Sequence, residues 1–361
     1  MLVETSNNIS KLLIISRFIE GLHLFCKEQV NDHCKRSILR FFFIQIDNLL
    51  KIVPRTKNNL FRESLLTQKQ KMEIERLTKI LSKSYDNAYD TIRDKIGAHS
   101  QHIDLSSLLK WWHEIDFTTV EVLYEDATNL LSSFSVVNCV KFSTAPDHTP
   151  VVLPASSRLS PDVTQPSIST DRLAAMKPNT MAMIACHPSQ DKAQLILSII
   201  EFLEIDFEFT SIVEEPTTIY HSTLFEVAWL LAIMDTCSLL DNLFEDTGYD
   251  KSLLNYWKEI NAAGCHNLED YQSKRNLEFE SSLKNIRNTL AAHIDDRKPF
   301  QELYKKYREL DLTALYNYAY LFINCFRSAC RQDFRTKIFC IHNMPVNDVI
   351  SVPNWTKPFD K

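Results

Sequence analysis

The sequence predicts an all-α protein, and three observations support this fold class. Glycine occurs only 4 times in 361 residues, against an average usage of about 7%, so tight hairpins and phosphate-binding loops are few. Apolar residues recur at helical spacing through most of the chain. Finally, residues 91–99 read TIRDKIGAH and residues 285–293 read NIRNTLAAH, which indicates a duplicated helical unit.

In the first copy, the apolar spacing predicts helices at residues 10–28, 34–52, 66–99, 105–112 and 118–134. The second of these is the most apolar, and we expect it to be central, with Asp47 as a polar residue at its buried end. Pro54 and the polar stretch after it are expected to end this helix, because proline interrupts helical hydrogen bonding.

The second copy repeats this plan, with predicted helices at residues 192–209, 222–246 and 276–293. The next helix begins with Asp-Leu-Thr at 311–313, as its counterpart begins with Asp-Phe-Thr at 116–118. An aspartate there is expected to cap the first free amides of the helix. Glu226, Asp235 and Asp241 interrupt the apolar run 224–243, which therefore predicts a buried helix and not a membrane span.

Each copy is predicted to end in a small β-hairpin, at residues 139–154 and 340–353, where short apolar runs are separated by turn formers. Between the copies, residues 155–190 are rich in Ser, Thr and Pro and are expected to form a flexible linker. We therefore predict an N-terminal domain of residues 1–154, a linker of residues 155–190, and a C-terminal domain of residues 191–355.

Composition excludes several classes of protein. The net charge of −6 predicts no broad attraction to nucleic acid, so any RNA contact would have to be local. The 9 cysteines are scattered and form no C-x-x-C pair, which argues against structural zinc and a disulfide framework. No dinucleotide-binding or P-loop motif occurs, and residues 1–10 lack the pattern of a signal peptide. We expect a cytoplasmic protein with no metal and no cofactor.

The duplicated segment preserves residues with chemical potential. In each copy an Arg stands six positions before a His and is followed by a polar Asp or Asn, and an Asp lies 46 residues before the Arg. The first copy has Asp47, Arg93, Asp94 and His99, and the second has Asp241, Arg287, Asn288 and His293. Because the two sets lie at equivalent positions, 194 residues apart, they carry more weight than a single match to the spacing.

This arrangement resembles the HEPN superfamily, whose signature is an Arg and a His separated by four to six residues on a helix of an all-α domain. Many members are metal-independent endoribonucleases of toxin–antitoxin, abortive-infection and CRISPR systems, in which two domains bring both motifs to one interface. The resemblance implies two tandem HEPN-like bundles, with RNA such as tRNA as substrate and an antitoxin or regulatory protein as partner. A pseudo-dimer within one chain and a homodimer of whole chains both remain open.

The resemblance also implies roles for these residues. Histidine titrates near neutrality, so His99 and His293 would serve as base and acid when the 2′-hydroxyl of RNA attacks its own phosphate. Arg93 and Arg287 would stabilise the charge on that phosphate. Asp94 and Asn288 would orient the imidazoles or bind ribose, and the products would carry 2′,3′-cyclic phosphates. Asp94 adds negative charge beside its Arg, so the copy with Asn288 is the safer candidate.

The rival interpretation is a non-catalytic helical interaction module. Asp47 with Arg93, and Asp241 with Arg287, would then be ion pairs that join two helices. Six residues along an ideal helix turn through roughly 600°, so Arg and His share a face only if the helix ends between them or the groove lies between them.

A second basic feature lies near the C-terminus. Arginines recur every four residues on the last predicted helix, at Arg327, Arg331 and Arg335. Such a stripe predicts either contacts with RNA phosphates or a solvated helix face.

Overall fold

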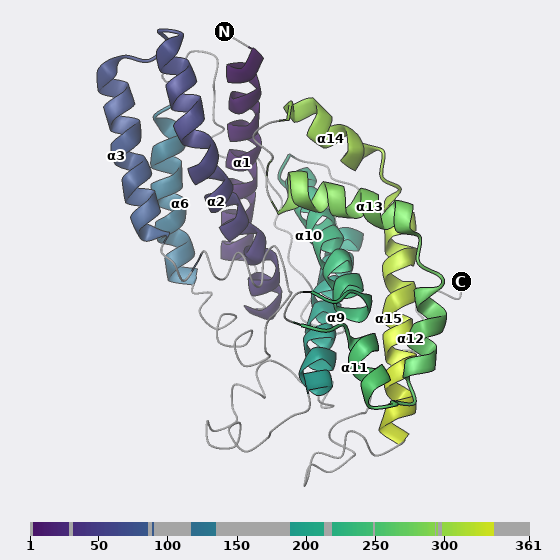
Figure 1. Ribbon diagram of the computed structural model, residues 1–361. Coiled ribbons are helices and arrows are strands. Elements are labelled where there is room, and N and C mark those ends of the chain that lie inside the picture. The colour runs from purple at the N-terminus through teal and green to yellow at the C-terminus, as the bar shows by residue number, and fades with distance from the viewer. Residues whose placement is uncertain are drawn as a thin grey trace.

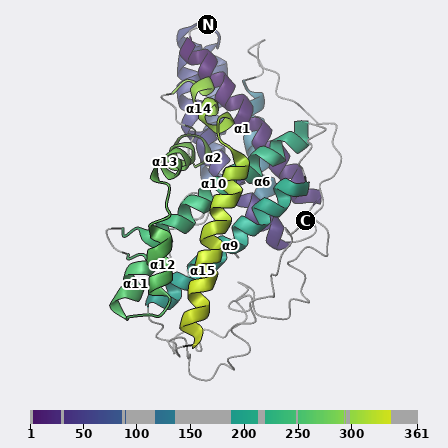
Figure 2. The same cartoon turned by 90° about the vertical axis from the view of Figure 1, so that its right-hand side faces the viewer.

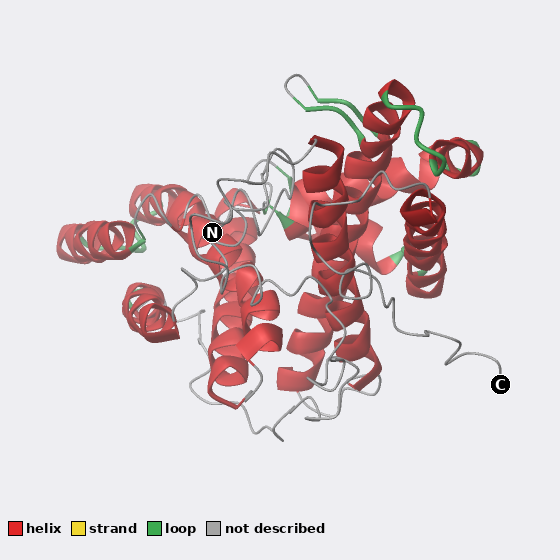
Figure 3. Cartoon of the chain, turned by 90° about the horizontal axis from the view of Figure 1, so that it is seen from below, coloured by secondary structure: helices red, strands yellow, loops and turns green. Residues whose placement is uncertain are grey.

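The computed structural model describes residues 3–28, 32–85, 89, 117–134, 188–212, 219–247, 250–292, 294 and 298–335. Within these ranges every regular element is a helix, apart from an isolated bridge between Thr247 and Asp250 (Figure 3). The all-α prediction is therefore confirmed. The predicted hairpins at 139–154 and 340–353, and the predicted linker as far as residue 187, lie outside the described residues.

The described residues 3–134, here called the first half, form four helices that lie together in Figure 1. They are α1 (Val3–Glu28), α2 (Asp32–Arg62), α3 (Gln68–Ser84) and α6 (Phe117–Ser132). α1 packs along α2, and α3 packs along α6. Thr67 caps α3: its Oγ1 accepts from Gln70 N at 3.3 Å, and its own amide donates to Gln70 Oε1 at 2.7 Å. This reciprocal pair fixes the start of α3.

The prediction that α2 ends at Pro54 is wrong, because the helix continues to Arg62. Proline removes a single amide donor, and the turn that follows is held by other contacts. Leu60 is 1% exposed in the core, and Thr56 Oγ1 donates to Ile52 O at 3.0 Å. Lys57 Nζ also pairs with Glu75 Oε1 of α3 at 2.7 Å. These tertiary contacts outweigh the local preference to break the helix.

The described residues 188–335, here called the second half, begin with two long helices and continue with shorter ones. In order they are α9 (Pro188–Ile212), α10 (Ile219–Phe244), α11 (Leu253–Glu259), α12 (Cys265–Gln272), α13 (Leu277–Ile286), the π-turn η2 (Arg287–Ala291), α14 (Phe300–Arg308) and α15 (Leu312–Arg335). Figure 2 shows α15 running beside α12.

The helices of the second half agree with the predicted start of α15, but they differ from the prediction at the start of α9 and in three short helices. Asp311 Oδ1 accepts from the amides of Thr313 and Ala314 at 2.9 and 3.1 Å, as expected for the cap of α15. α9 begins at Pro188, three residues before the predicted start of the C-terminal domain at 191. The helices α11, α12 and α14 were not predicted, because each is too short to show a clear period.

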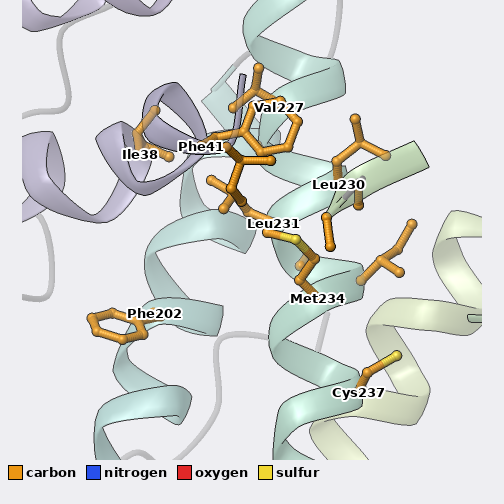
Figure 4. Packing of buried hydrophobic residues seen from close by; sticks show 14 of the residues in the cluster. Ile38, Phe41, Phe202, Val227, Leu230, Leu231, Met234 and Cys237 are labelled. Carbon is orange, nitrogen blue, oxygen red and sulfur yellow. The ribbon is translucent and has the colours of Figure 1, made fainter. Parts of the chain in front are cut away.

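One continuous apolar core joins both halves, and α10 lies at its centre. Figure 4 shows Ile38 and Phe41 of α2 beside Val227 and Leu231 of α10 within that core. The segment Ser222–Phe244 is long and apolar enough to cross a membrane, but 89% of its apolar window is buried inside the protein. The prediction that this run is a buried helix is therefore confirmed.

Candidate functional site

The structure describes about half of the predicted site residues. Arg287 and Asn288 lie on η2, Asp241 on α10 and Asp47 on α2. Four others lie outside the described residues, as do two side chains of the basic stripe. These are Arg93, Asp94, His99 and His293, and the side chains of Arg331 and Arg335.

Arg287 begins a π-turn that directly follows α13. The amide of Ala292 donates to Arg287 O at 2.7 Å, which closes a ring one residue wider than in an α-helix. Such turns are frequent at functional sites. The turn ends at Ala291, two residues before His293. The rotation of an ideal helix therefore does not determine how Arg287 and His293 are placed.

The side chain of Arg287 is buried and held in place, with the residue 8% exposed. Its Nη1 donates to Asp241 Oδ2 at 3.0 Å, and its Nε donates to Asn288 Oδ1 at 3.1 Å. The ion pair expected between Asp241 and Arg287 is therefore present and joins α10 to η2. Among the described residues, no hydrogen bond engages Nη2, so part of the guanidinium fork is not used by this scaffold.

Asp241 is shared with a second cation. Lys284 Nζ lies 2.9 Å from Asp241 Oδ1 and 3.0 Å from both carboxylate oxygens of Glu245. Burial alone would lower the pKa of Lys284, but the hydrogen bond with Asp241 and the charge of that carboxylate raise it above its usual value. Lys284 therefore stays charged and fixes the carboxylate that holds Arg287.

The network extends away from the π-turn through Arg275. Its Nη2 donates to Glu245 Oε1 at 2.7 Å and to Glu280 Oε2 at 2.5 Å. Tyr318 OH donates to Glu280 Oε1 at 2.6 Å, which ties the network to α15. Burial acts to raise the pKa of Glu245, but the hydrogen bonds from Arg275 and Lys284 lower it below the usual value. Three carboxylates thus face three cations, and the whole array is electrically balanced.

Lys284 and Glu245 were not among the residues predicted for the site. Glu245 stands four residues after Asp241, and Lys284 stands three residues before Arg287. Those spacings place each pair on one face of its helix. That signal was available in the sequence, but many surface charges share it.

The chain just beyond the second Arg…His segment binds to the first half. The amide of Ile294 donates to Asn48 Oδ1 at 3.2 Å, and the two residues are 5% and 2% exposed. Asn48 follows Asp47 on α2, so the second segment ends against the central helix of the first half, beside a predicted site residue.

The equivalent residue of the second half is Asn242, on α10. Asn242 accepts from Lys192 Nζ at 3.0 Å and donates to Ser238 O at 2.7 Å, both within the second half.

Two further candidates have protein partners. Asp47 Oδ2 lies 2.7 Å from Lys51 Nζ on the same helix, while its expected partner Arg93 lies outside the described residues. Arg327 Nη2 donates to Glu204 Oε1 at 2.6 Å and joins α15 to α9. The charge of Arg327 is thus neutralised in the fold, which favours a structural role for it over a phosphate contact.

Within the part of the chain that the structure describes, no three His, Cys, Asp or Glu side chains gather as a metal site would require. No protein-family model, no curated protein and no solved structure matches this chain.

Proposed function

We propose that this protein is a metal-independent endoribonuclease whose site combines both Arg…His segments in one chain. His99 and His293 would act as the base and acid, and Arg93 and Arg287 would stabilise the phosphate. In this proposal the two halves form HEPN-like domains that pair within the chain.

The observation that carries the proposal is the hydrogen bond from Ile294 to Asn48. A composite site requires the second Arg…His segment to lie against the first half, close to the polar site residues of that half. The bond holds Ile294, the residue after His293, against Asn48 of α2, and Asn48 is the neighbour of Asp47 in the sequence. The buried neighbours Ala292 and Ile294 support a fixed backbone on either side of position 293.

The environment of Arg287 is also suitable for binding a phosphate. Asp241 and Asn288 hold two of its donors, and a guanidinium fixed in this way loses little conformational entropy when it binds. Lys284 pairs with the other carboxylate oxygen of Asp241 and so fixes the group that orients Arg287. A fixed positive group next to a developing negative charge contributes to the rate without rearrangement.

A second candidate function is a non-catalytic helical interaction module. Arg287 is 8% exposed and paired with Asp241 at 3.0 Å, as in an ion pair that only joins two helices. Removing one partner of such an ion pair destabilises the fold whether or not the protein has an activity. Stability measurements on Arg287 therefore do not separate the two functions, and an assay of RNA cleavage is required.

The experiment is to incubate the purified full chain with total RNA in excess EDTA. We expect cleavage that leaves 2′,3′-cyclic phosphate ends. His99→Ala and His293→Ala should each reduce the rate by about 10²- to 10⁴-fold, because each imidazole transfers a proton. Arg287→Lys keeps the charge but loses the fork, so a reduced rate there would assign the guanidinium to the phosphate.

His266→Ala is the matched control, since its side chain on α12 is 92% exposed and its removal should leave cleavage unchanged. Cleavage that EDTA abolishes, or that survives both histidine substitutions, contradicts the proposed site. The interaction module is favoured if the folded wild-type protein cleaves none of the RNA.

The biological setting follows from the same proposal. Because the Arg…His segments resemble those of HEPN ribonucleases in toxin–antitoxin and abortive-infection systems, we propose a toxin or antiviral protein. It would act in the cytoplasm on tRNA or other RNA and would be restrained by an antitoxin or regulatory protein. Expression with and without the two histidine substitutions tests this, because only the wild type should arrest growth and deplete intact RNA.

A further inference from the structure

The two halves meet through four long helices in a pattern that suggests a two-fold relation. Sequence repetition matches α1 with α9 and α2 with α10. In the structure α1 contacts α10, α2 contacts α9, and α2 contacts α10. Exchanging the halves converts the α1–α10 contact into the α9–α2 contact and leaves the α2–α10 contact unchanged. The same relation holds in an isologous dimer of two identical copies. The packing is close: a Cβ on Gly21 would lie 3.0 Å from Thr223 Cγ2.

At the centre of this interface lies a buried charged cluster, the Arg40 triad, made of Arg40, Asp206 and Asp235. Arg40 comes from α2 of the first half, and the two acids come from α9 and α10 of the second half. The three side chains are 0%, 0% and 1% exposed. Arg40 Nη1 and Nη2 donate to the two carboxylate oxygens of Asp235 at 3.1 and 2.8 Å, and Asp206 Oδ2 lies 3.8 Å from Nη2.

The rest of the guanidinium is also enclosed. Its Nε donates to Ser37 O at 2.8 Å, and its Cζ stands 4.1 Å from the centre of the Phe202 ring of α9. A bidentate pair with a carboxylate and an aromatic face are the surroundings in which a buried arginine is tolerated. Burial and the nearby Asp235 carboxylate raise the pKa of Asp206 well above its usual value, which keeps it a neutral acid and balances the triad.

The triad does not follow the repeat. At the 194-residue offset, Arg40 corresponds to Met234, and Asp235 corresponds to Phe41. Asp206 corresponds to Leu12 at the same offset. The first half thus carries the cation without an acid at these positions, and the second half carries both acids without the cation. All of the equivalent positions are apolar.

We propose that the Arg40 triad is a pairing key: it makes the interface of the first half accept the second half and reject a copy of itself. Two first halves paired in this way would bury two arginines among apolar side chains. Two second halves would bury four carboxyl groups without a cation. A buried charge that lacks its partner strongly disfavours a complex. The key therefore selects the unlike pair, and it does so whether or not the protein cleaves RNA.

This proposal distinguishes between the two assemblies that the repeat allows. A homodimer that pairs like halves across subunits is excluded by the key, whereas the unlike pair forms within one chain or by exchange between two chains. Residues 135–187 join the halves, a length that spans on the order of 170 Å at full extension, so both forms of unlike pairing are within reach.

The test uses full chains with reversed charges. Arg40→Asp gives a chain whose key positions are all acidic, and Asp235→Arg gives a chain with two opposed cations. Each variant alone should fail to pair its halves and should lose its compact monomer. Co-expression should restore folding as a 1:1 heterodimer with twice the mass of one chain, because each first half then finds a complementary second half in the other chain. Light scattering after size exclusion measures this.

Two further variants complete the design. Arg40→Asp combined with Asp235→Arg in one chain should return a compact monomer. Arg17→Glu is the matched control, because Arg17 also pairs across the halves with Glu226, but the side chains are 33% and 22% exposed and water screens the charge. It should remain a monomer without a partner chain. Compact monomers from both single reversals, or a co-expressed pair that does not associate, would overturn the proposal.

If the reversed charges prevent folding even in the combined variant, neutral substitutions decide the question. Arg40→Met and Asp235→Asn are each measured alone and together by urea unfolding. The key predicts that the combined variant loses less unfolding free energy than the sum of the two single losses. The difference should correspond to at least about tenfold in the unfolding constant. Additive effects would show that the two side chains do not recognise one another, and would overturn the pairing key.

Discussion

Buried ionisable side chains show how far the surroundings of a residue decide its chemistry here. Arg287 and Lys284 share one carboxylate, that of Asp241, which fixes the positions of both cations in the fold. Cys237, one turn earlier on α10, is 1% exposed, and burial raises the pKa of its thiol to about 12. It therefore stays a neutral thiol at ordinary pH and packs as an apolar residue.

The raised pKa of Asp206 predicts a pH-dependent stability. In the folded protein this carboxyl keeps its proton above the ordinary pKa of 3.8, whereas in the unfolded chain it does not. Its contribution to stability is therefore complete below that pKa and is lost as the pH rises through the folded-state pKa. Asp206→Asn, which cannot ionise, should remove this loss. Urea unfolding of both proteins across a pH series measures it, and parallel profiles would contradict the assignment.

At the scale of elements, helix ends and interruptions are decided by different forces. Local side-chain bonding sets the starts of α3 and α15, at Thr67 and Asp311. Tertiary packing carries α2 through Pro54. The π-turn at Arg287 replaces the last turn of a helix and points the chain towards Asn48 of α2. Elements that carry the candidate site are therefore shaped by contacts between helices.

Pro54→Ala should stabilise the protein. The position is exposed on α2, and alanine restores both the missing amide donor and a better helical propensity. We expect a gain of about 1–2 kcal/mol in the free energy of unfolding, which chemical denaturation would detect. Thr67→Ala is a useful comparison, since loss of the capping box should cost about 1 kcal/mol. A destabilised Pro54→Ala protein would show that the proline is needed in the folded helix.

For the molecule as a whole, the two halves share one apolar core with a charged centre. α10 contacts helices of both halves, and the Arg40 triad lies where α2, α9 and α10 meet. The halves are therefore packed against one another through a shared core. A duplicated sequence can still give one cooperative unfolding unit when the two copies bury a common core.

We expect the wild-type chain to unfold in a single transition. Arg40→Met leaves Asp235 without its cation in a dry interface, so it should lower stability by about 3–5 kcal/mol and separate the unfolding of the two halves. Scanning calorimetry measures both effects, through the agreement between calorimetric and van't Hoff enthalpies. A single unchanged transition in the variant would mean that the apolar contacts alone couple the halves.

Much of the helical plan was predictable from the sequence because it depends on local signals. Apolar spacing located most of the long helices, although α3 ends at Ser84, well before the predicted end at residue 99. The charges within 224–243 indicated a buried helix, and Asp311 marked the start of α15. The rival interpretation of the repeat also included the ion pair of Asp241 with Arg287, which the structure contains. Each of these features can be recognised within a single helix or within a single copy of the repeat.

By itself the sequence determined an all-α fold and the approximate positions of most of its long helices. Only the tertiary structure decided that α2 continues past Pro54, that Asn48 binds Ile294, and that Arg40 is buried against Asp235. These outcomes depend on contacts between residues far apart in the chain. The free energies of those contacts come from desolvation and packing at an interface. Periodicity records which face of a helix is buried, but it does not record what that face is buried against.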